Sequence, residues 1–344
     1  MKRQPDAQNH GETTIDHVAA AAGVSVRTVS RVLNGSSLVK PATRLQVEQV
    51  IASMNFSPSS RARGLALRRS FLIGLIHNDH NALVLDSLQR AVISTTVSSG
   101  YELITHPASL GSQDAVNELL AFVERSRVDG LIVLPPVSGI PGLAKALSDA
   151  GVRAVALSSV PIDGFSDVVI SREREAGALV ARYLMDLGHK RLGLVNGPME
   201  VASAKERRAG FVDEASARGA SVFEAEGDYG FASGVAGAAH LLSLERRPTA
   251  IFAANDIMAA GVLKVAASLG IAIPSELSVI GFDGSMITRM LTPALTSVYR
   301  PFGEMAQGAA RRLIALIEGK ELPPLPEVTM EVVPAESTAM TAMP

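Results

Sequence analysis

The chain contains no cysteine and no tryptophan, and aromatic residues make up only 4% of its 344 residues. The absence of cysteine excludes disulfide bonds and thiolate metal sites, and it permits a reducing compartment. No stretch approaches the roughly 18 consecutive apolar residues of a membrane helix, and the polar first residues do not resemble a signal peptide. We therefore expect a cytoplasmic protein that has no membrane segment.

The small net charge of −2 conceals an uneven distribution of charge. Residues 1–70 hold ten Lys and Arg against four Asp and Glu, a net charge of +6, whereas the rest hold 22 against 30, a net charge of −8. The length and the 47% of hydrophobic residues suffice for two or three folded units. A basic head on an acidic body predicts that only the head binds a polyanion.

The first 56 residues read as three short helices. Residues 13–22 form a helix that stops at Gly23, Ser25 caps a second that ends near Asn34, and Pro41 starts a third. Three helices with a short turn between the first two make a helix-turn-helix unit.

The second helix is amphipathic. One face carries Val26, Val29, Val32 and Leu33, and the opposite face carries Arg27, Ser30, Arg31 and Asn34. Taken alone, this pattern fits a solvated surface better than a nucleic-acid contact.

Residues 57–70 are rich in Ser and Arg and leave two interpretations open. The simpler one is a solvated linker. The other is a short helix that orders on a phosphate backbone, with Leu65 and Leu67 as its large apolar side chains.

From residue 71 onward, apolar strand-like runs alternate with amphipathic helices. Examples of the runs are FLIGLI, GLIVLPP, RLGLVNG and LSVIGFD. Continuous apolar strands separated by helices indicate parallel sheets covered on both faces. Their number predicts an α/β core of two doubly wound lobes.

Ligands of such sheets collect at the carboxyl ends of the strands, and polar residues follow several runs. They are His77, Asn78, Asp79, Ser158, Ser159, Asn255, Asp256 and Asp283. Asn255 can equally serve as a helix cap, and for Arg207 in the stretch ERRAGF the less favoured alternative is a surface pair with Glu206 or Glu214.

Both halves of the chain resemble one family. The stretch TTIDHVAAAAGVSVRTVSRVLNG and the segments LMDLGHKRLGLVNGP, ERRAGF, FAANDIMAAGVLKVAASLG and LTPALTSVYRP are similar to lactose-repressor (LacI/GalR) family transcription regulators. The resemblance implies a homodimeric DNA-binding repressor that needs no cofactor. A small effector, a sugar or a sugar acid, then occupies the cleft of a core resembling periplasmic sugar-binding proteins.

The resemblance also implies a division into domains. Residues 1–56 are the DNA-binding domain, 57–70 the hinge helix, 71–330 the effector-binding core and 337–344 a tail. Within the core, the first lobe takes about 71–168 and 300–327, and the second takes about 169–299 and 328–336.

The residues that the family motifs assign to double-stranded operator DNA lie in the second helix and the hinge. They are Ser25, Val26, Arg27, Thr28, Ser30, Arg31, Asn34, Arg61, Arg63 and Leu65. An Arg can grip a guanine bidentately in the major groove, and Leu65 stands at the position of a leucine wedge in the minor groove. A two-fold dimer then requires a pseudopalindromic operator.

The residues assigned to the effector lie in the core. They are His77, Asp79, Val84, Ser158, Arg207, Asn255, Asp283 and Phe302. The chain departs from the family pattern at His17, Val84, Ser158 and the stretch SRERE of residues 171–175. Because Arg172 and Arg300 add positive charge, a carboxylate-bearing sugar is one hypothesis for the effector.

Two other classes of protein share such a core. An enzyme is disfavoured because the GxSxG, GxxxxGK and HExxH motifs are absent. A secreted solute-binding protein would need a signal peptide and would have no use for the basic head.

Overall fold

The computed structural model describes residues 13–33, 36, 38–54, 56, 69–78, 81–110 and 114–341. The chain divides into two compact units, with the boundary between Phe71 and Leu72.

The first unit is a bundle of three short helices, which confirms the helix-turn-helix prediction. The helices are α1 (Ile15–Ala21), α2 (Val26–Leu33) and α3 (Pro41–Ser53). Thr14 caps α1 through its side chain, and His17 completes a capping box because its Nδ1 accepts a hydrogen bond from Thr14 N at 3.2 Å. His17, at a position where the family usually has an acid, therefore performs the same task.

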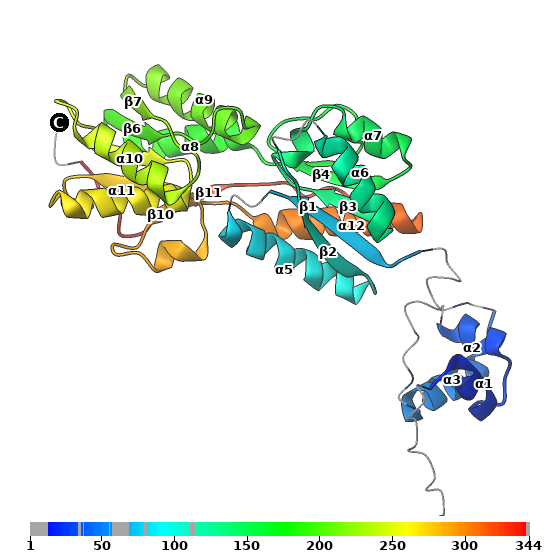
Figure 1. The fold of residues 1–344 in the computed structure, drawn as a ribbon. Coiled ribbons are helices and arrows are strands. Elements are labelled where there is room, and N and C mark those ends of the chain that lie inside the picture. Colours follow the sequence, from blue (N-terminus) through cyan, green and yellow to red (C-terminus); the bar gives the residue numbers. More distant parts are fainter. Residues whose placement is uncertain are drawn as a thin grey trace, which may run out of the picture. The chain divides into compact units, whose positions relative to one another are not determined.

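The first lobe of the second unit is a five-stranded parallel sheet between helices (Figure 1). Its elements are β1 (Leu72–His77), α5 (Ala82–Ser98), β2 (Glu102–Pro107), α6 (Ala115–Ser126), β3 (Gly130–Val133), η1 (Val137–Gly139), α7 (Leu143–Asp149), β4 (Arg153–Ser158), β5 (Val168–Ile170) and α12 (Phe302–Glu318). The strand order is β2-β1-β3-β4-β5. Helices α5 and α12 pack together on one face, and α6 and α7 cover the other.

The second lobe is a six-stranded sheet of order β11-β10-β9-β8-β6-β7, parallel except for the pair β10–β11. Its elements are α8 (Glu173–Asp186), β6 (Arg191–Val195), α9 (Ala202–Ala217), β7 (Ser221–Ala225), α10 (Phe231–Leu242), β8 (Ala250–Ala253), α11 (Asp256–Ser268), β9 (Ser278–Asp283), η2 (Met286–Arg289), β10 (Thr296–Tyr299) and β11 (Glu331–Val333). Helices α8 and α9 cross closely at Gly177 and Gly210, where an added Cβ would overlap backbone atoms of the other helix. Helices α10 and α11 cover the opposite face.

The two lobes are joined by segments that follow β5, β10 and α12. Residues 171–173 and 300–302 therefore lie at the join, and side chains from both segments face the same space. The chain thus has the predicted two-lobed α/β core.

Residues 337–341, which were predicted to be a tail, pack against the second lobe. Ser337 is completely buried, its hydroxyl donates to Val279 O at 2.6 Å, and it accepts from Thr296 N at 2.8 Å. The prediction is therefore wrong for this segment, because its hydrogen bonds extend the second lobe.

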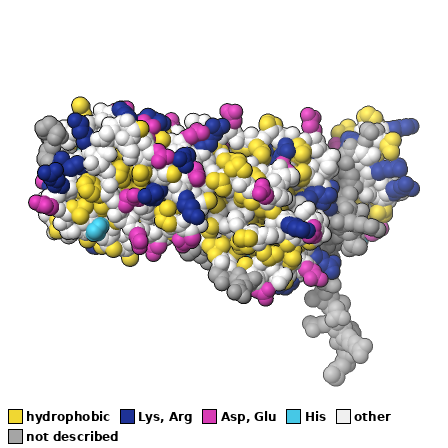
Figure 2. All heavy atoms as spheres, turned by 90° about the horizontal axis from the view of Figure 1, so that it is seen from above, with side chains coloured by type: hydrophobic (Ala, Val, Ile, Leu, Met, Phe, Trp, Pro, Cys, Tyr) yellow, Lys and Arg dark blue, Asp and Glu magenta, His cyan; other side chains and the backbone are white. Residues whose placement is uncertain are grey.

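Acidic and basic side chains are interspersed over the face shown in Figure 2, and hydrophobic side chains gather in patches between them. The described residues contain no helix with the length and hydrophobicity of a bilayer-spanning segment. They also contain no group of His, Asp and Glu side chains arranged to hold a metal ion.

Candidate functional sites

Helix α2 places two basic side chains at the surface of the head. The Ser25 hydroxyl accepts a hydrogen bond from Thr28 N at 3.2 Å and so caps the helix. Arg27 is exposed, and Arg31, one turn later, is partly exposed, as is Ser30. A capped, rigid helix with guanidinium groups one turn apart has the dimensions and charge to enter a major groove.

The apolar face of α2 is narrower than the sequence pattern indicates. Val29 is fully buried and Val32 is 5% exposed, but Val26 is 39% exposed. Val26, which shares the apolar face with Val29 and Val32 in the sequence pattern, therefore lies partly at the surface. It occupies the first helical position, and the buried contacts of α2 begin one turn later.

Five of the predicted site residues lie outside the described residues. They are Asn34, Arg61, Arg63, Leu65 and Asp79.

The core contains a cavity of about 650 Å³ at the carboxyl ends of strands from both lobes. Its size falls within the range of roughly 300–1,000 Å³ that is usual for small-molecule sites. Six of the predicted effector residues line it: His77, Val84, Arg207, Asn255, Asp283 and Phe302.

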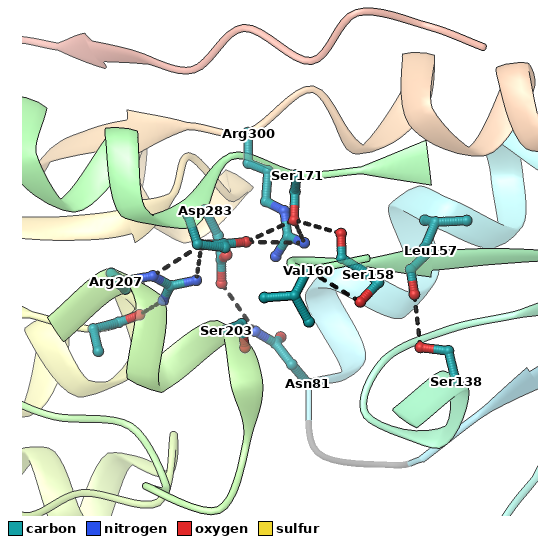
Figure 3. Close-up of polar contacts among 12 residues, drawn as sticks. Asn81, Ser138, Leu157, Ser158, Val160, Ser171, Ser203, Arg207, Asp283 and Arg300 are labelled. Carbon is teal, nitrogen blue, oxygen red and sulfur yellow. Dashed lines mark hydrogen bonds and ion pairs between the residues drawn. The ribbon is translucent and has the colours of Figure 1, made fainter. Parts of the chain in front are cut away.

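Ser158 lies beside this cavity without lining it. Its hydroxyl accepts a hydrogen bond from Val160 N at 3.2 Å, and its carbonyl accepts one from Ser171 N at 2.8 Å (Figure 3). The hydroxyl thus accepts a hydrogen bond within its own loop, and its O–H is still able to donate one.

Arg207 projects from α9 into the buried edge of the cavity and is 3% exposed. Its Nε and Nη2 donate to Glu173 Oε2 at 3.1 and 2.7 Å, and its Nη1 donates to the carbonyl of Ala254. The guanidinium carbon lies 3.5 Å from the ring centroid of Phe282. Arg207 is thus held from several directions and faces the site.

The alternative of a surface ion pair for Arg207 is wrong. Glu206 pairs instead with Arg174 at 3.6 Å, and Glu214 pairs with Arg182 at 3.0 Å.

Glu173 joins the two arginines of the cavity. It is fully buried, and Arg300 Nη2 lies 3.1 Å from its Oε1 while also donating to Ser171 Oγ at 2.9 Å. Burial alone would raise the pKa of Glu173, but the charges of Arg207 and Arg300 hold it below its ordinary value. Burial alone would lower the pKa of Arg207, but the ion pair with Glu173 outweighs it and raises the pKa of Arg207 above its ordinary value. The cluster of Arg207, Glu173 and Arg300 therefore carries one net positive charge.

Asp283 is the buried acidic group among the acidic residues that line the cavity. Burial raises its pKa to about 7, against the lowering influence of Arg207 and with a further rise from the charge of Asp256. Asn81 Nδ2 from the first lobe donates to its Oδ2 at 3.4 Å. Its φ of 105° is unusual for a residue with a side chain, and such strain is concentrated at functional sites.

Asp256 lies behind Asp283 and supports the loop that follows β9. Its Oδ2 accepts from Ser285 N and Ser285 Oγ at 2.7 and 2.8 Å, and Ser297 Oγ donates to its Oδ1. Burial raises its pKa to about 6 in spite of these hydrogen bonds.

Asn255 caps a helix and also lines the cavity. Its Oδ1 accepts from Met258 N at 2.8 Å and caps α11, and its Nδ2 donates to Tyr229 O at 2.9 Å while the residue lines the cavity.

Several residues of the site were not predicted from the sequence, among them Tyr229 and Glu173. Tyr229 lines the cavity, has a φ of 69°, and its hydroxyl lies 3.3 Å from Ser203 Oγ. Tyr229 follows β7 closely in the sequence, and β7 was not identified from the sequence. Glu173 gave no signal, because its partners are 34 and 127 residues away. Arg172, suggested as a positive group of the site, is exposed and pairs with Glu175 at 3.1 Å.

Models of two known protein families match this chain, one in each of its two units. Residues 14–59 match the model of bacterial regulatory proteins of the lacI family, and residues 181–338 match that of the periplasmic binding protein-like domain.

Two curated repressors are similar over most of the chain. The HTH-type transcriptional repressor PurR of Proteus mirabilis (strain HI4320) is 33% identical over 316 residues, 89% of this chain and 91% of that protein. The ribose operon repressor of Escherichia coli (strain K12) is 31% identical over 304 residues, 88% and 92% of the two chains.

Solved structures of regulators show the same fold. The lac repressor dimer bound to operator and the anti-inducer ONPF has a TM-score of 0.77 and 28% identity, covering 96% of this chain and 100% of that one. The transcriptional regulator CelR in complex with cellobiose has a TM-score of 0.69 and 27% identity, covering 95% and 100%. Identity above 30% across nearly the full length of curated repressors shows that the chain belongs to the lacI family of bacterial regulatory proteins.

Proposed function

We propose that this lacI-family regulator binds a pseudopalindromic DNA operator as a homodimer, acts as a repressor, and changes its operator affinity when a small effector occupies the cavity between the core lobes. The observation that carries the proposal is the combination on one chain of a capped helix exposing Arg27 with a cavity lined by Arg207 and Asp283. A solute-binding protein or an enzyme would have no need of the first feature.

The DNA contacts follow from the exposed face of α2. Arg27 and Arg31 bind base edges or phosphates, Ser25, Thr28 and Ser30 support them from the same helix, and Val26 packs against a thymine methyl group. The exposure of Val26 supports that contact, since no other described part of the head covers it. Asn34, Arg61, Arg63 and Leu65 enter this proposal on the family motif alone.

The effector proposal places a sugar or a sugar acid in the cavity. The names of similar proteins include a ribose operon repressor and a regulator bound to cellobiose. Asp283 accepts hydrogen bonds, and Arg207 keeps two of its five N–H groups beyond those engaged by Glu173 and Ala254. Donors and acceptors on one wall suit a molecule with several hydroxyl groups.

The test is binding of the purified full chain to fragments of the promoters of its own genome, measured by fluorescence anisotropy beside a random duplex of equal length. We expect at least one fragment to be bound more tightly than the random duplex, with an affinity that falls steeply as salt rises. Metabolites that raise the melting temperature of the protein are then added to the complex. Failure to discriminate any fragment, with and without such metabolites, refutes the proposal.

A further inference from the structure

The first helix of the head begins with a capping box in which one of the two side chains is a histidine. Thr14 Oγ1 accepts a hydrogen bond from His17 N at 3.4 Å, and His17 Nδ1 accepts one from Thr14 N at 3.2 Å. Capping boxes usually have Glu or Gln at the position of His17. The start of α1 therefore relies on a ring nitrogen as one of its two hydrogen-bond acceptors.

Only the neutral form of the His17 ring can accept this hydrogen bond. A neutral imidazole has one nitrogen that accepts and one that donates, so the bond from Thr14 N places the ring hydrogen on Nε2. A protonated imidazole carries a hydrogen on both nitrogens and has no acceptor. Protonation therefore breaks this half of the box and adds a positive charge at the N-terminus of a helix, where the helix dipole disfavours cations.

The surroundings of His17 offer the protonated ring no compensating ion pair. Helices α2 and α3 pack against α1. The charged residues of these three helices are Asp16, Arg27, Arg31, Arg44 and Glu48. Asp16 precedes His17 directly, and adjacent positions on a helix do not face each other. Within the described residues no ion pair includes His17, and the residue is exposed, so protons reach it from water. Imidazoles change charge between about pH 5 and pH 8.

The start of α1 matters for DNA binding because α1 supports α2. Val18 is fully buried, Ala19 and Ala22 are 4% and 1% exposed, and all three belong to one apolar cluster with Val29 of α2. Helix α1 has only seven residues, and a helix this short depends on its cap and its packing. Loss of the cap therefore loosens the support of the helix that exposes Arg27.

We propose that the head is pH-sensitive: protonation of His17 opens the capping box, loosens α1 and weakens operator binding as the pH falls from about 7.5 to about 5.5. An acid at this position, which the family usually has, would keep its charge and its acceptors over the same range. The effect on operator binding rests on the proposed function, whereas the opening of the capping box does not.

The first test is amide hydrogen exchange of the full chain, followed by mass spectrometry on peptides that cover α1. The reference is His17→Gln, because glutamine accepts the same hydrogen bond and stays neutral at every pH. The ratio of the wild-type exchange rate to that of the variant cancels the intrinsic effect of pH on exchange. We expect this ratio to rise about threefold or more between about pH 7.5 and pH 5.5, since loss of a cap changes the opening equilibrium by about 2- to 30-fold.

Two control variants separate the capping box from other effects of acid. His240→Gln removes an exposed imidazole of α10 in the core and should leave the pH dependence of exchange in α1 unchanged. Thr14→Ala removes the hydroxyl acceptor of the box, which does not titrate in this range, and should speed exchange in α1 at both pH values.

The second test is DNA binding, measured by fluorescence anisotropy with a promoter fragment that the wild type prefers and a random duplex of equal length. Between about pH 7.5 and pH 5.5 we expect the affinity of the wild type for the fragment to fall about threefold or more relative to that of His17→Gln. Tighter binding by the wild type than by the variant at the lower pH would make the charged ring a DNA contact and would contradict the proposal.

The proposal is overturned if the exchange ratio is the same at both pH values, if His240→Gln abolishes its change, or if it rises while the relative affinity for a preferred fragment stays constant. The two tests also separate this failure from that of the proposed function. An exchange ratio that rises as expected, in a protein unable to discriminate any promoter fragment, would support the opening of the capping box and refute the regulator. Discrimination of a fragment with no pH dependence in either test would do the reverse.

Discussion

Replacing Glu173 with Gln should destabilise the core more than any change at the surface. The substitution keeps the size of the side chain and removes the one negative charge that Arg207 and Arg300 share, at distances of 2.7 and 3.1 Å. The two guanidinium groups, which are 3% and 9% exposed as side chains, would then lose the carboxylate that contacts both of them and keep Asp283 as a more distant acidic group.

The expected magnitude follows from the burial of all three groups. Removing one partner of a buried ion pair costs about 3–5 kcal/mol, because the remaining charge stays desolvated. For a core of this size such a loss lowers the melting temperature by roughly 5–15 °C. The same neutralisation in the exposed pair Arg90–Asp86, whose side chains are 79% and 55% exposed, should cost about 0–1 kcal/mol.

Differential scanning calorimetry of the wild type, Glu173→Gln and the control Asp86→Asn checks this expectation. A double variant, Glu173→Gln with Arg300→Gln, restores the single net positive charge of the cluster and should recover part of the lost stability. If Glu173→Gln melts within about 2 °C of Asp86→Asn, or if the double variant is the sum of its parts, the argument from a shared counter-ion is refuted.

Three further predictions concern the helix crossing, the buried carboxyls and the head. Gly177→Ala should lower the free energy of unfolding by about 1–3 kcal/mol or more, because its Cβ would overlap the backbone of α9. In the control Gly303→Ala, the Cβ meets open space among the described residues, so the free energy of unfolding should stay the same or rise by up to about 1 kcal/mol. Equal midpoints of urea unfolding for the two variants would contradict this prediction. Burial raises the pKa of Asp283 to about 7, above its value in the unfolded chain. The folded state therefore binds more protons than the unfolded state between about pH 4 and pH 7, and the free energy of unfolding should fall as the pH rises through that window. In Asp283→Asn the melting temperature should fall less over the same window, and an unchanged pH profile would show that Asp283 is ionised throughout. If Arg27 binds a base, Arg27→Ala should weaken operator binding by about 1–3 kcal/mol. If Arg27 binds a phosphate, the variant should lower the salt dependence of binding and weaken binding to the operator and to random duplex equally. Unchanged affinity for both DNAs would show that Arg27 does not contact DNA.

The sequence by itself determined the elements and their classes. The apolar runs and the intervening helices from residue 71 onward predicted two doubly wound lobes, because strands covered on both faces must be apolar throughout. Ser25 as a cap and Pro41 as a first-turn residue predicted the starts of the second and third helices correctly, since helix starts depend on residues a few positions away. The positions of Asn255 and Asp283 in the cavity were predicted because strand ends of parallel sheets converge at one edge, whereas that of Arg207, in α9, was predicted from the family resemblance.

Only the tertiary structure decided what these residues contact. Local periodicity gives a face of a helix but not the depth of packing, since Val26 shares a face with the fully buried Val29 and is itself 39% exposed. Folding brings together the loops and segments that make three sets of contacts. These are the hydrogen bond from Val160 N to Ser158, the ion pairs of Glu173 with Arg207 and Arg300, and the packing of residues 337–341 on the second lobe. Packing between segments that are distant in the sequence buries Asp283 and so raises its pKa, and it also brings leucine and proline side chains into the lining of the cavity. No short stretch of the sequence contains all the residues that take part in this packing.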